Sequence, residues 1–364
     1  MAGNLNTLAG LRSASEAATA SFAGMPTLTR AWYNKTYLSV AMPKLVHDQF
    51  GMPTDLPQGN GEQVMWRRWL KLNPNTVPLT DGITPTGKTL AYENVLGTVY
   101  WYGDWVAITD VVKFMHPDNV LTQATKRLAT QSGETKDIIT RDIINAGTSF
   151  LRVTASGTTP TTGVGARTTV AGVITKKAID TAITILDGND SEHFLGQMQA
   201  STKVSTEPIG AAYVGICHPH VAHDFANPLS GFTFGTDWIP REKYASGSTA
   251  YPSEIGKYRN VRFVTSTLAK VWPDSGDTTT VGTTAAATYR STTGTNGDVY
   301  SVLILAKESF GTIKLAGSAA TYYDPPGGNA DPLHRKATAG WKGCWGAAIL
   351  NDDYMVRVEC LAAW

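Results

Sequence analysis

The apolar positions of the chain recur at a helical period most clearly between residues 118 and 146. The stripe consists of Leu121, Ala124, Leu128, Ser132, Thr135, Ile139, Ile143 and Ala146. Residues with this spacing share one face of a helix. Asp118 or Asn119 can cap its start and Gly147 its end, whereas Gly133 is its weak point. The pattern predicts one long helix, on the order of 40 Å at ~1.5 Å per residue.

Segments rich in β-branched and aromatic residues predict strands through much of the remaining chain. Residues 64–72 and 92–112 predict the sides of a long hairpin, because the segment between them is rich in proline, glycine and threonine. The other predicted elements are strands at 211–217, 260–267, 299–309 and 345–363, a helix at 176–190, and a short helix that starts at Pro219.

Other segments carry little strand periodicity. Residues 1 to about 29 are small and polar, which is typical of an arm that orders on a partner. A helical pattern follows over 32–46, where Pro43 is expected to kink or split it. The Thr/Gly tracts at 154–169 and 274–298 predict excursions on the surface.

Composition narrows the class of protein. The 364 residues exceed what one hydrophobic core usually serves, so we expect two domains or one domain with large excursions. Charged residues make up only 17% and the net charge is +1, which gives no global reason for tight nucleic-acid binding. This light charge suits a strand-rich protein or one whose surface is covered by partners.

The sequence also indicates in which compartment the protein resides. Cys217, Cys344 and Cys360 are an odd and scattered set, which argues against a disulfide framework and favours a reducing compartment. No run approaches the roughly 20 apolar residues of a membrane helix. The N-terminus lacks the pattern of a secretory signal, so we expect a soluble protein of the cell that makes it, without membrane contact.

The segment Gly82–Thr89 reads GITPTGKT and fits the phosphate-binding pattern G-x-x-x-x-G-K-[ST]. That pattern works when a buried strand precedes the loop and a helix opens at the lysine. Here the preceding segment contains prolines and the following one favours a strand. Pro85 also lacks the backbone N–H that should face a phosphate. The context favours a hairpin tip over a nucleotide site.

The segment 217–225 reads CHPHVAHDF and offers candidate zinc ligands. On a helix starting at Pro219, His220 and His223 share a face, and His218 could add a third ligand. However, the His-Glu-x-x-His pattern of zinc peptidases is absent and no second cluster accompanies it. The alternative is a strand-to-helix turn with partly exposed histidines.

Signals for covalent catalysis or nucleic-acid stacking are weak. The chain has no G-x-S-x-G elbow and no cysteine in a recognisable nucleophile context. In the predicted strand 64–72, Trp66, Arg68 and Leu70 would share one face, opposite Arg67, Trp69 and Lys71. Such faces can stack on nucleic acid, or pair with acidic neighbours across a subunit contact, which we favour.

The most specific sequence motifs lie in residues 330–359, and further motif stretches precede them along the chain. Their elements are Ala330 to Leu333, His334-Arg335, Gly340 to Lys342, Ile349 to Asp352, and Met355 to Arg357. The accompanying stretches are PLTDGITPTG (78–87), YGDWVAITD (102–110), YVGICHPHVAHDF (213–225), EIGKYRNVRFVTS (254–266) and DVYSVLILAKESFGTIKL (298–315). Together they resemble the major capsid proteins of tailed bacteriophages, in the N-four-like coat protein family. The resemblance covers about residues 30–360, with Asp81 where glutamate is commoner.

This resemblance implies an α+β fold, the Johnson fold (Hong Kong phage type). It divides the chain into an N-terminal arm and first helix, an extended β-hairpin loop, a peripheral domain with a long spine helix, and an axial domain with surface insertions. The implied bounds are 1–60 for the arm, 61–112 for the hairpin, 113–153 and 298–364 for the peripheral domain with its spine helix at 118–146, and 154–297 for the axial domain.

The implied function is a structural protein, not an enzyme, that self-assembles into the icosahedral shell of a double-stranded DNA phage. The implied partners are other copies in hexamers and pentamers, a scaffolding protein, a portal protein at one vertex, a possible decoration protein, and packaged DNA bound without sequence specificity. The location would be the virion capsid, assembled in the host bacterial cytoplasm.

The resemblance implies no cofactor, no metal and no catalytic residue. It marks as assembly or structural motif positions Asp81, Gly82, Pro85, Gly87, Tyr102, Gly103, Asp110, Asp331, Pro332, Arg335, Gly340, Trp341, Lys342, Asn351, Asp352 and Arg357. Competing hypotheses are a zinc-dependent hydrolase that uses His218, His220 and His223, and a β-rich viral adhesin suggested by the Thr/Gly-rich strands.

Overall fold

The computed structural model describes most of the chain beyond residue 44. The described residues are 45–115, 119–154, 161–162, 166–194, 196, 208–225, 232, 237–244, 251, 253–277, 289–293, 295–318, 320–325 and 333–363. The predicted arm, nearly all of the helical pattern at 32–46, Asp118, Asp331, Pro332 and much of both Thr/Gly tracts lie outside them.

The long predicted helix is α3 (Val120–Ile144). Asn119 caps its start, where the side-chain oxygen accepts the backbone N–H of Thr122 at 3.2 Å. Gly133 accommodates the preceding segment, because a Cβ there would lie 2.7 Å from Leu45 Cδ1. The predicted helix and its cap at Asn119 are confirmed. No helix in the described part of the chain is long and apolar enough to cross a membrane.

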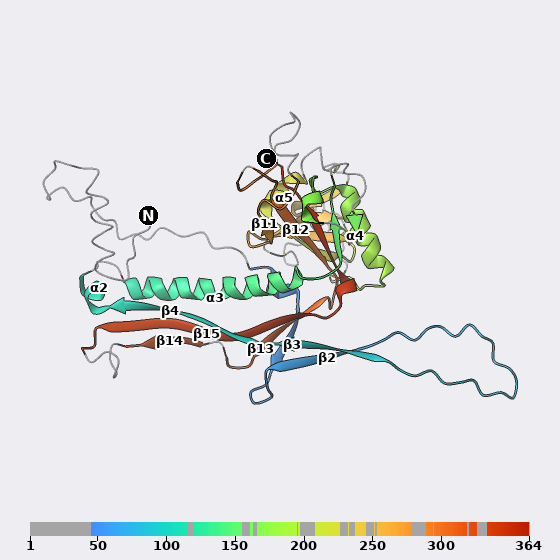
Figure 1. Cartoon of the computed structure of the whole chain (residues 1–364), viewed down its shortest axis with the longest axis horizontal. Coiled ribbons are helices and arrows are strands. Elements are labelled where there is room, and N and C mark those ends of the chain that lie inside the picture. The colour runs from blue at the N-terminus through green and yellow to red at the C-terminus, as the bar shows by residue number, and fades with distance from the viewer. Residues whose placement is uncertain are drawn as a thin grey trace.

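The first sheet is built around one long strand, β15, and lies under α3 (Figure 1). Strand β4 pairs antiparallel with one edge of β15, and β13 and β14 pair in succession with its other edge. Strand β1 extends the sheet parallel to β13. The bounds are β1 (Met52–Leu56), β4 (Tyr100–Thr109), β13 (Phe310–Leu315), β14 (Ala320–Asp324) and β15 (Lys336–Ile349).

A two-stranded hairpin projects from this sheet. Strands β2 (Gln63–Trp69) and β3 (Tyr92–Thr98) pair antiparallel from Gln63↔Thr98 to Trp69↔Tyr92. The segment 70–91 forms the tip and contains no helix or strand. Sequence patterns had grouped Trp105–Asp110 with the hairpin, but β4 pairs with β15 instead. The tip points away from the end of the molecule that carries α2 (Asp110–Met115) (Figure 1).

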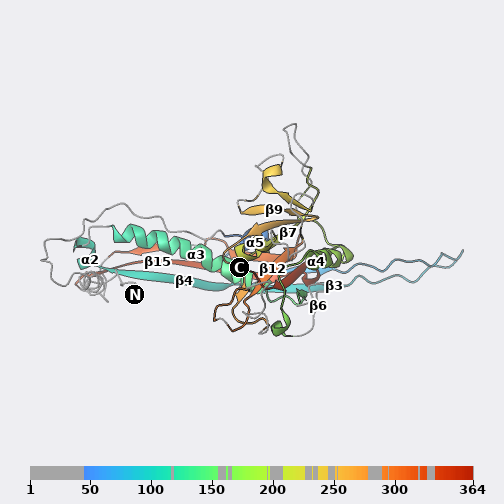
Figure 2. The same cartoon turned by 90° about the horizontal axis from the view of Figure 1, so that it is seen from above.

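A compact body at the other end of α3 contains the second sheet (Figures 1 and 2). Helices α4 (Lys176–Gly188) and α5 (Pro219–Asp224) cover one of its faces, and the end of α3 with the short helix η1 (His47–Phe50) packs on the other. The strands are β5 (Phe150–Arg152), β6 (Thr161–Thr162), β7 (Tyr213–Cys217), β8 (Trp238–Pro240), β9 (Glu254–Tyr258), β10 (Val261–Thr265), β11 (Val271–Trp272), β12 (Val299–Leu305) and β16 (Met355–Cys360). The remaining short helices are η2 (Arg167–Thr169), η4 (Arg241–Lys243) and η6 (Asp352–Tyr354).

Candidate assembly surfaces

The hairpin tip holds the first group of motif residues. Asp81, Gly82, Pro85 and Gly87 are all exposed, and Gly82 adopts a left-handed conformation with φ of 73° that closes a tight turn. Lys88 donates to the carbonyl oxygen of Asn73 on the opposite side of the tip. The chain then enters strand β3, not a helix. Gly82–Thr89 therefore lacks the helix that a phosphate-binding loop requires, as the sequence context predicted.

The hairpin exposes apolar side chains along its length. At the tip, Val77, Leu79 and Ile83 are 71%, 73% and 66% exposed. On the shaft, Trp69 and Leu96 are 58% and 59% exposed. A monomer rarely leaves so many large apolar side chains of one hairpin open to water unless a partner covers them.

The charged groups of the shaft find partners within the hairpin. Arg68 pairs with Glu93 across the strands at 2.6 Å. The Arg67 guanidinium lies over the ring of Tyr92, 4.3 Å from its centroid, and donates to the side chain of Asn94. These contacts engage two of the basic residues that the sequence had offered for nucleic-acid stacking or a subunit contact; the third, Lys71, pairs with Asp190 at 3.1 Å.

The root of the hairpin is fixed against the first sheet by Trp66. A Cβ added to Gly97 would lie 2.6 Å from its indole ring, and one added to Gly311 would lie 2.9 Å away. The indole N–H donates to the hydroxyl of Thr54 at 3.3 Å. Because the indole fits only where both neighbours are glycine, the direction of the hairpin is set by packing.

The sheet face opposite α3 carries an aromatic groove of about 410 Å³. Trp101, Trp105 and Tyr322 form its walls and are 53%, 63% and 57% exposed. The ammonium group of Lys342 lies over the Trp101 ring, 4.4 Å from its centroid. Two further motif residues, Gly103 and Gly340, line the floor, where any larger residue would collide with the adjacent strand.

The sheet face beneath α3 is closed by a tryptophan cluster. The Trp341 indole N–H donates to Gln131 on α3 at 3.2 Å, and Gln131 in turn donates to Asp104 at 2.7 Å. The hydrogen bond from Gln131 lowers the pKa of Asp104, aided by the backbone N–H of Trp105. Tyr102 stacks on Trp345 in the same layer, and its burial raises the pKa of its hydroxyl. These contacts attach the sheet to α3.

Arg357 lies in a buried ionic cluster centred on Glu359. Its Nε donates to Glu359 at 3.0 Å, while Arg152 approaches the same carboxylate at 2.9 Å and Arg167 at 3.2 Å. The Arg357 guanidinium also donates to the backbone carbonyls of Asn145 and Gly147, just past α3. Burial lowers the pKa of Arg357, and the Glu359 charge opposes that shift. The cluster joins β5 and β16 to the end of α3.

Two more motif residues act as local caps. Asp352 accepts the backbone N–H of Thr148 at 3.1 Å, which holds the turn after α3. Asn351 accepts the backbone N–H of Asp353 at 3.3 Å and so caps η6. The Asp352 contact lies next to Gly147, whose carbonyl oxygen accepts a hydrogen bond from Arg357.

The pair Asp110–Arg335 lies at the far end of the sheet, beside α2. The Arg335 Nε and the Asp110 carboxylate are 3.8 Å apart, and the Asp110 backbone N–H donates to the Arg335 carbonyl at 2.9 Å. The remaining members of this motif, Asp331 and Pro332, fall outside the described residues.

The candidate zinc ligands do not converge. His218 and His220 stack edge to face, with ring centroids 4.3 Å apart, but His223 points to solvent, with its side chain 72% exposed. His218 Nδ1 accepts the backbone N–H of His220, so in the neutral ring the proton sits on Nε2, which leaves no lone pair there for a metal. Among the described residues, no group of three or more candidate ligands could hold a metal ion.

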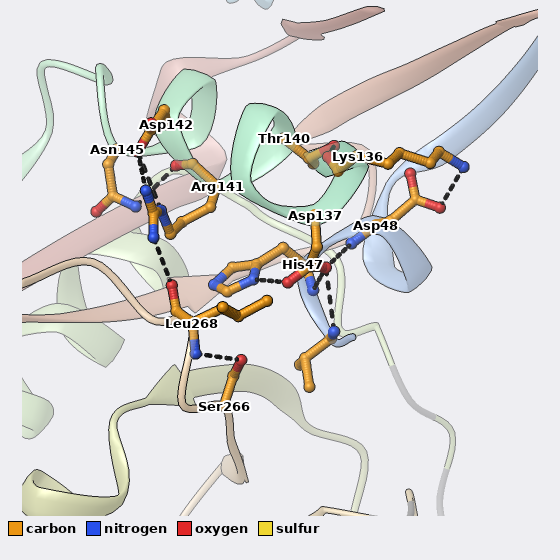
Figure 3. A network of polar contacts seen from close by, with 11 residues as sticks. His47, Asp48, Lys136, Asp137, Thr140, Arg141, Asp142, Asn145, Ser266 and Leu268 are labelled. Carbon is orange, nitrogen blue, oxygen red and sulfur yellow. Dashed lines mark hydrogen bonds and ion pairs between the residues drawn. The ribbon is translucent and has the colours of Figure 1, made fainter. Parts of the chain in front are cut away.

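Sequence patterns missed a buried junction at the middle of α3 (Figure 3). Asp137 is 1% exposed, and one carboxylate oxygen accepts the backbone N–H groups of Val46 and His47 at 3.1 and 2.8 Å. The other oxygen lies 2.8 Å from His47 Nδ1. Asp137 is thus a cap that α3 supplies to η1. No local sequence signal indicates a cap between residues so far apart in the chain.

The same stretch of α3 reaches the second sheet. Arg141 donates to the carbonyl oxygen of Leu268 at 2.8 Å (Figure 3). Asp142 pairs with Lys270 at 3.0 Å. Asn145 accepts the hydroxyl of Ser301 on β12 at 2.6 Å. Successive turns of α3 therefore hold first η1, which precedes β1 and the hairpin, and then the compact body.

Comparison with known proteins shows which solved structures share this architecture. No model of a known protein family matches the sequence, and no curated protein is similar to it. The capsid of Ralstonia phage GP4 aligns with a TM-score of 0.60 at 12% identity, over 93% of this chain and 96% of that one. The cyanophage P-SCSP1u capsid structure aligns with a TM-score of 0.57 at 13% identity, over 92% and 93%. The cyanophage Pam1 capsid gives 0.57 at 14%, over 93% and 98%. The predicted α+β fold of tailed-phage capsid proteins is confirmed.

Proposed function

We propose that this chain is a major capsid protein that assembles into the icosahedral shell of a tailed bacteriophage. The observation that carries the proposal is the hairpin. It projects from the sheet with its apolar tip uncovered. The tip points away from β4, β14 and β15 (Figure 1), the strands whose residues line the aromatic groove. The likeness of the whole fold to phage capsid structures supports the same conclusion.

The tip and the groove suit each other chemically. The tip is extended and carries Pro74, Pro78 and Pro85 between exposed aliphatic side chains. Grooves walled by tryptophan and tyrosine bind proline-rich extended segments well, since the ring faces pack together at low entropic cost. Because the tip of one copy points away from its own groove, it would reach the groove of a neighbour. Contacts of this head-to-tail kind close into rings, such as hexamers and pentamers.

The parts of the fold take the following roles in this proposal. Residues 1–60 supply the arm and first helix, 61–112 the extended hairpin, 113–153 and 298–364 the peripheral domain, and 154–297 the axial domain. The motif residues that the structure describes have structural roles: they form the tip, the groove floor, the tryptophan cluster, the Asp110–Arg335 pair and the contacts at the end of α3. We do not assign them a catalytic role.

The wider partners follow from a shell in a tailed phage. They are a scaffolding protein during assembly, a portal protein at one vertex, a possible decoration protein on the outside, and packaged DNA bound without sequence specificity inside. Assembly would take place in the host bacterial cytoplasm, and the finished protein would reside in the virion.

The proposal is tested by electron microscopy and analytical ultracentrifugation of the expressed protein, alone and with the scaffolding protein of its virus. We expect closed shells, tubes or rings from the natural sequence. The triple variant Val77→Ser, Leu79→Ser, Ile83→Ser should stay unassembled, while its unfolding midpoint should be unchanged because the tip is exposed.

A matched control changes Thr76, Thr80 and Thr84 of the same tip to serine. These side chains are also exposed, and their replacement leaves the apolar ones in place, so this variant should assemble normally. A uniform small particle from the natural sequence under both conditions would overturn the proposed function. Normal assembly of the Val77, Leu79 and Ile83 variant would overturn the role of the tip.

A further inference from the structure

Helix α5 begins with an unusual cap. Pro219 occupies its first position, and the residue before it, His218, supplies the side chain that accepts the backbone N–H of His220 at 3.2 Å. Serine, threonine, aspartate and asparagine usually fill this role, because their oxygens accept a hydrogen bond over a wide pH range. Histidine accepts one only through an unprotonated ring nitrogen.

The cap therefore depends on the protonation state of a single ring. Neutral His218 places its proton on Nε2 and presents the Nδ1 lone pair to His220. The protonated imidazolium carries N–H groups at both nitrogens, so its Nδ1 would face the N–H of His220 donor to donor. Protonation and capping exclude each other.

The surroundings of His218 keep the ring neutral while leaving it within reach of water. Its ring stacks with His220 and lies 5.3 Å from the ring of Tyr300 on β12. His220 Nδ1 in turn lies 3.0 Å from the Tyr300 hydroxyl. The three rings border a cavity of about 400 Å³ that Arg290 and Asp298 also line.

The charges around the cavity act in a consistent direction on His218. Burial, His220 and Arg290 together lower its pKa to about 4. Burial and Arg290 also lower the pKa of His220, although Asp298 opposes this shift. Two titratable groups remain on α5 itself: the exposed His223 and the buried Asp224.

We propose that His218 is a proton-operated cap that holds α5 against β12 when neutral and frees the first turn of α5 when it binds a proton. The released turn would withdraw His220 from the Tyr300 hydroxyl, because both contacts begin in the same turn. The cavity that α5 and β12 share with residues 290–292 and Asp298 would then open. The inference is independent of the proposed assembly role.

The direction of the pH effect follows from the two states of the chain. In the unfolded chain His218 titrates near its usual value, roughly 6.5, whereas in the folded protein it resists protonation until about pH 4. The stabilisation from the cap is therefore complete above pH ~6.5 and declines as the pH falls from there toward the folded value.

The variant His218→Asn separates the cap from the proton switch, since asparagine caps well and does not titrate. His223→Gln is the matched control, because it removes an exposed histidine from the same helix. Hydrogen exchange of the full-length protein, read by mass spectrometry on peptides spanning 219–225 and corrected for intrinsic rates, is compared at pH 7.5 and 4.5.

We expect exchange in this helix to rise at least several-fold at pH 4.5 in the natural sequence and in His223→Gln, and to stay low in His218→Asn. Equal exchange in His218→Asn and the natural sequence at pH 4.5 would overturn the proposal. Should His218→Asn fold poorly, His218→Ser provides the same comparison. A nuclear magnetic resonance titration of His218 with a midpoint near roughly 6.5, the usual value for histidine, would also refute the cap.

Discussion

Replacement of Glu359 by glutamine should lower the free energy of unfolding far more than the replacement of an exposed charged residue. The carboxylate is fully buried in β16 and is shared by Arg152 at 2.9 Å and Arg357 at 3.0 Å, with side-chain exposures of only 6% and 7%. Arg167 adds a third contact at 3.2 Å from a more exposed position. Glutamine keeps the size of the side chain but removes the negative charge that these buried guanidinium groups share.

The magnitude follows from the geometry. At an effective dielectric constant of about 20, two unit charges about 3 Å apart attract by roughly 5 kcal/mol. Desolvation cancels much of this gain when the pair forms, but the cost remains when one partner is removed. Breaking a buried pair in this way typically costs about 3 to 5 kcal/mol. A typical domain is stable by roughly 5 to 15 kcal/mol, so Glu359→Gln should lose a large fraction of the total.

The assay is urea unfolding of the unassembled subunit, followed by circular dichroism. The matched control is Glu93→Gln, which removes the partner of Arg68 on the hairpin, where the Glu93 side chain is 55% exposed. Solvent screening limits that pair to about 1 kcal/mol or less. Equal losses in the two variants, or a loss below about 1 kcal/mol for Glu359→Gln, would show that burial does not govern the strength of the Arg357 cluster.

Two further changes test burial elsewhere. Asp224 is completely buried, one of its carboxylate oxygens accepts the backbone N–H of Ala363, and burial raises its pKa to about 6. The free energy of unfolding should therefore fall as the pH rises from about 4 through 6. Asp224→Asn should abolish that fall and raise the free energy of unfolding by roughly 2 to 3 kcal/mol at pH 7.5, measured by urea unfolding. A steeper fall in Asp224→Asn would contradict this assignment. Gly346→Ala should cost roughly 1 to 3 kcal/mol by the same assay, since its Cβ would collide with the carbonyl oxygen of Thr98, whereas Gly188→Ala, with open space around it, should be neutral or stabilising. Equal stability of the two alanine variants would disprove the close approach at Gly346.

Local patterns predicted the elements whose signals are local. The long helix follows from its apolar period and from Asn119, and both appear in α3. The hairpin follows from two strand patterns around a segment rich in turn residues, and β2 and β3 pair as that pattern requires. The cap residues and turn residues act within a few positions of themselves, so the sequence displays them directly.

Contacts between distant segments were not visible in the same way. The partner of β4 is β15, and nothing in either segment specifies the register Trp105↔Gly340. The buried residues Asp137 and Glu359 look like ordinary surface charges in the sequence, yet each holds several elements together. Their roles depend on which segments the fold brings into contact, and a single sequence does not encode that in any short pattern.

The continuity of β3 and β4 has a mechanical consequence. Only Val99, itself buried, separates the two strands, so tension on the hairpin passes directly into β4. Strand β4 is paired with β15 in unbroken register from Tyr100↔Trp345 to Thr109↔Lys336. A pull along the hairpin axis therefore loads these backbone hydrogen bonds in shear, all at once, and does not peel them apart one by one. The projecting hairpin is thus anchored in the first sheet through the whole length of β4.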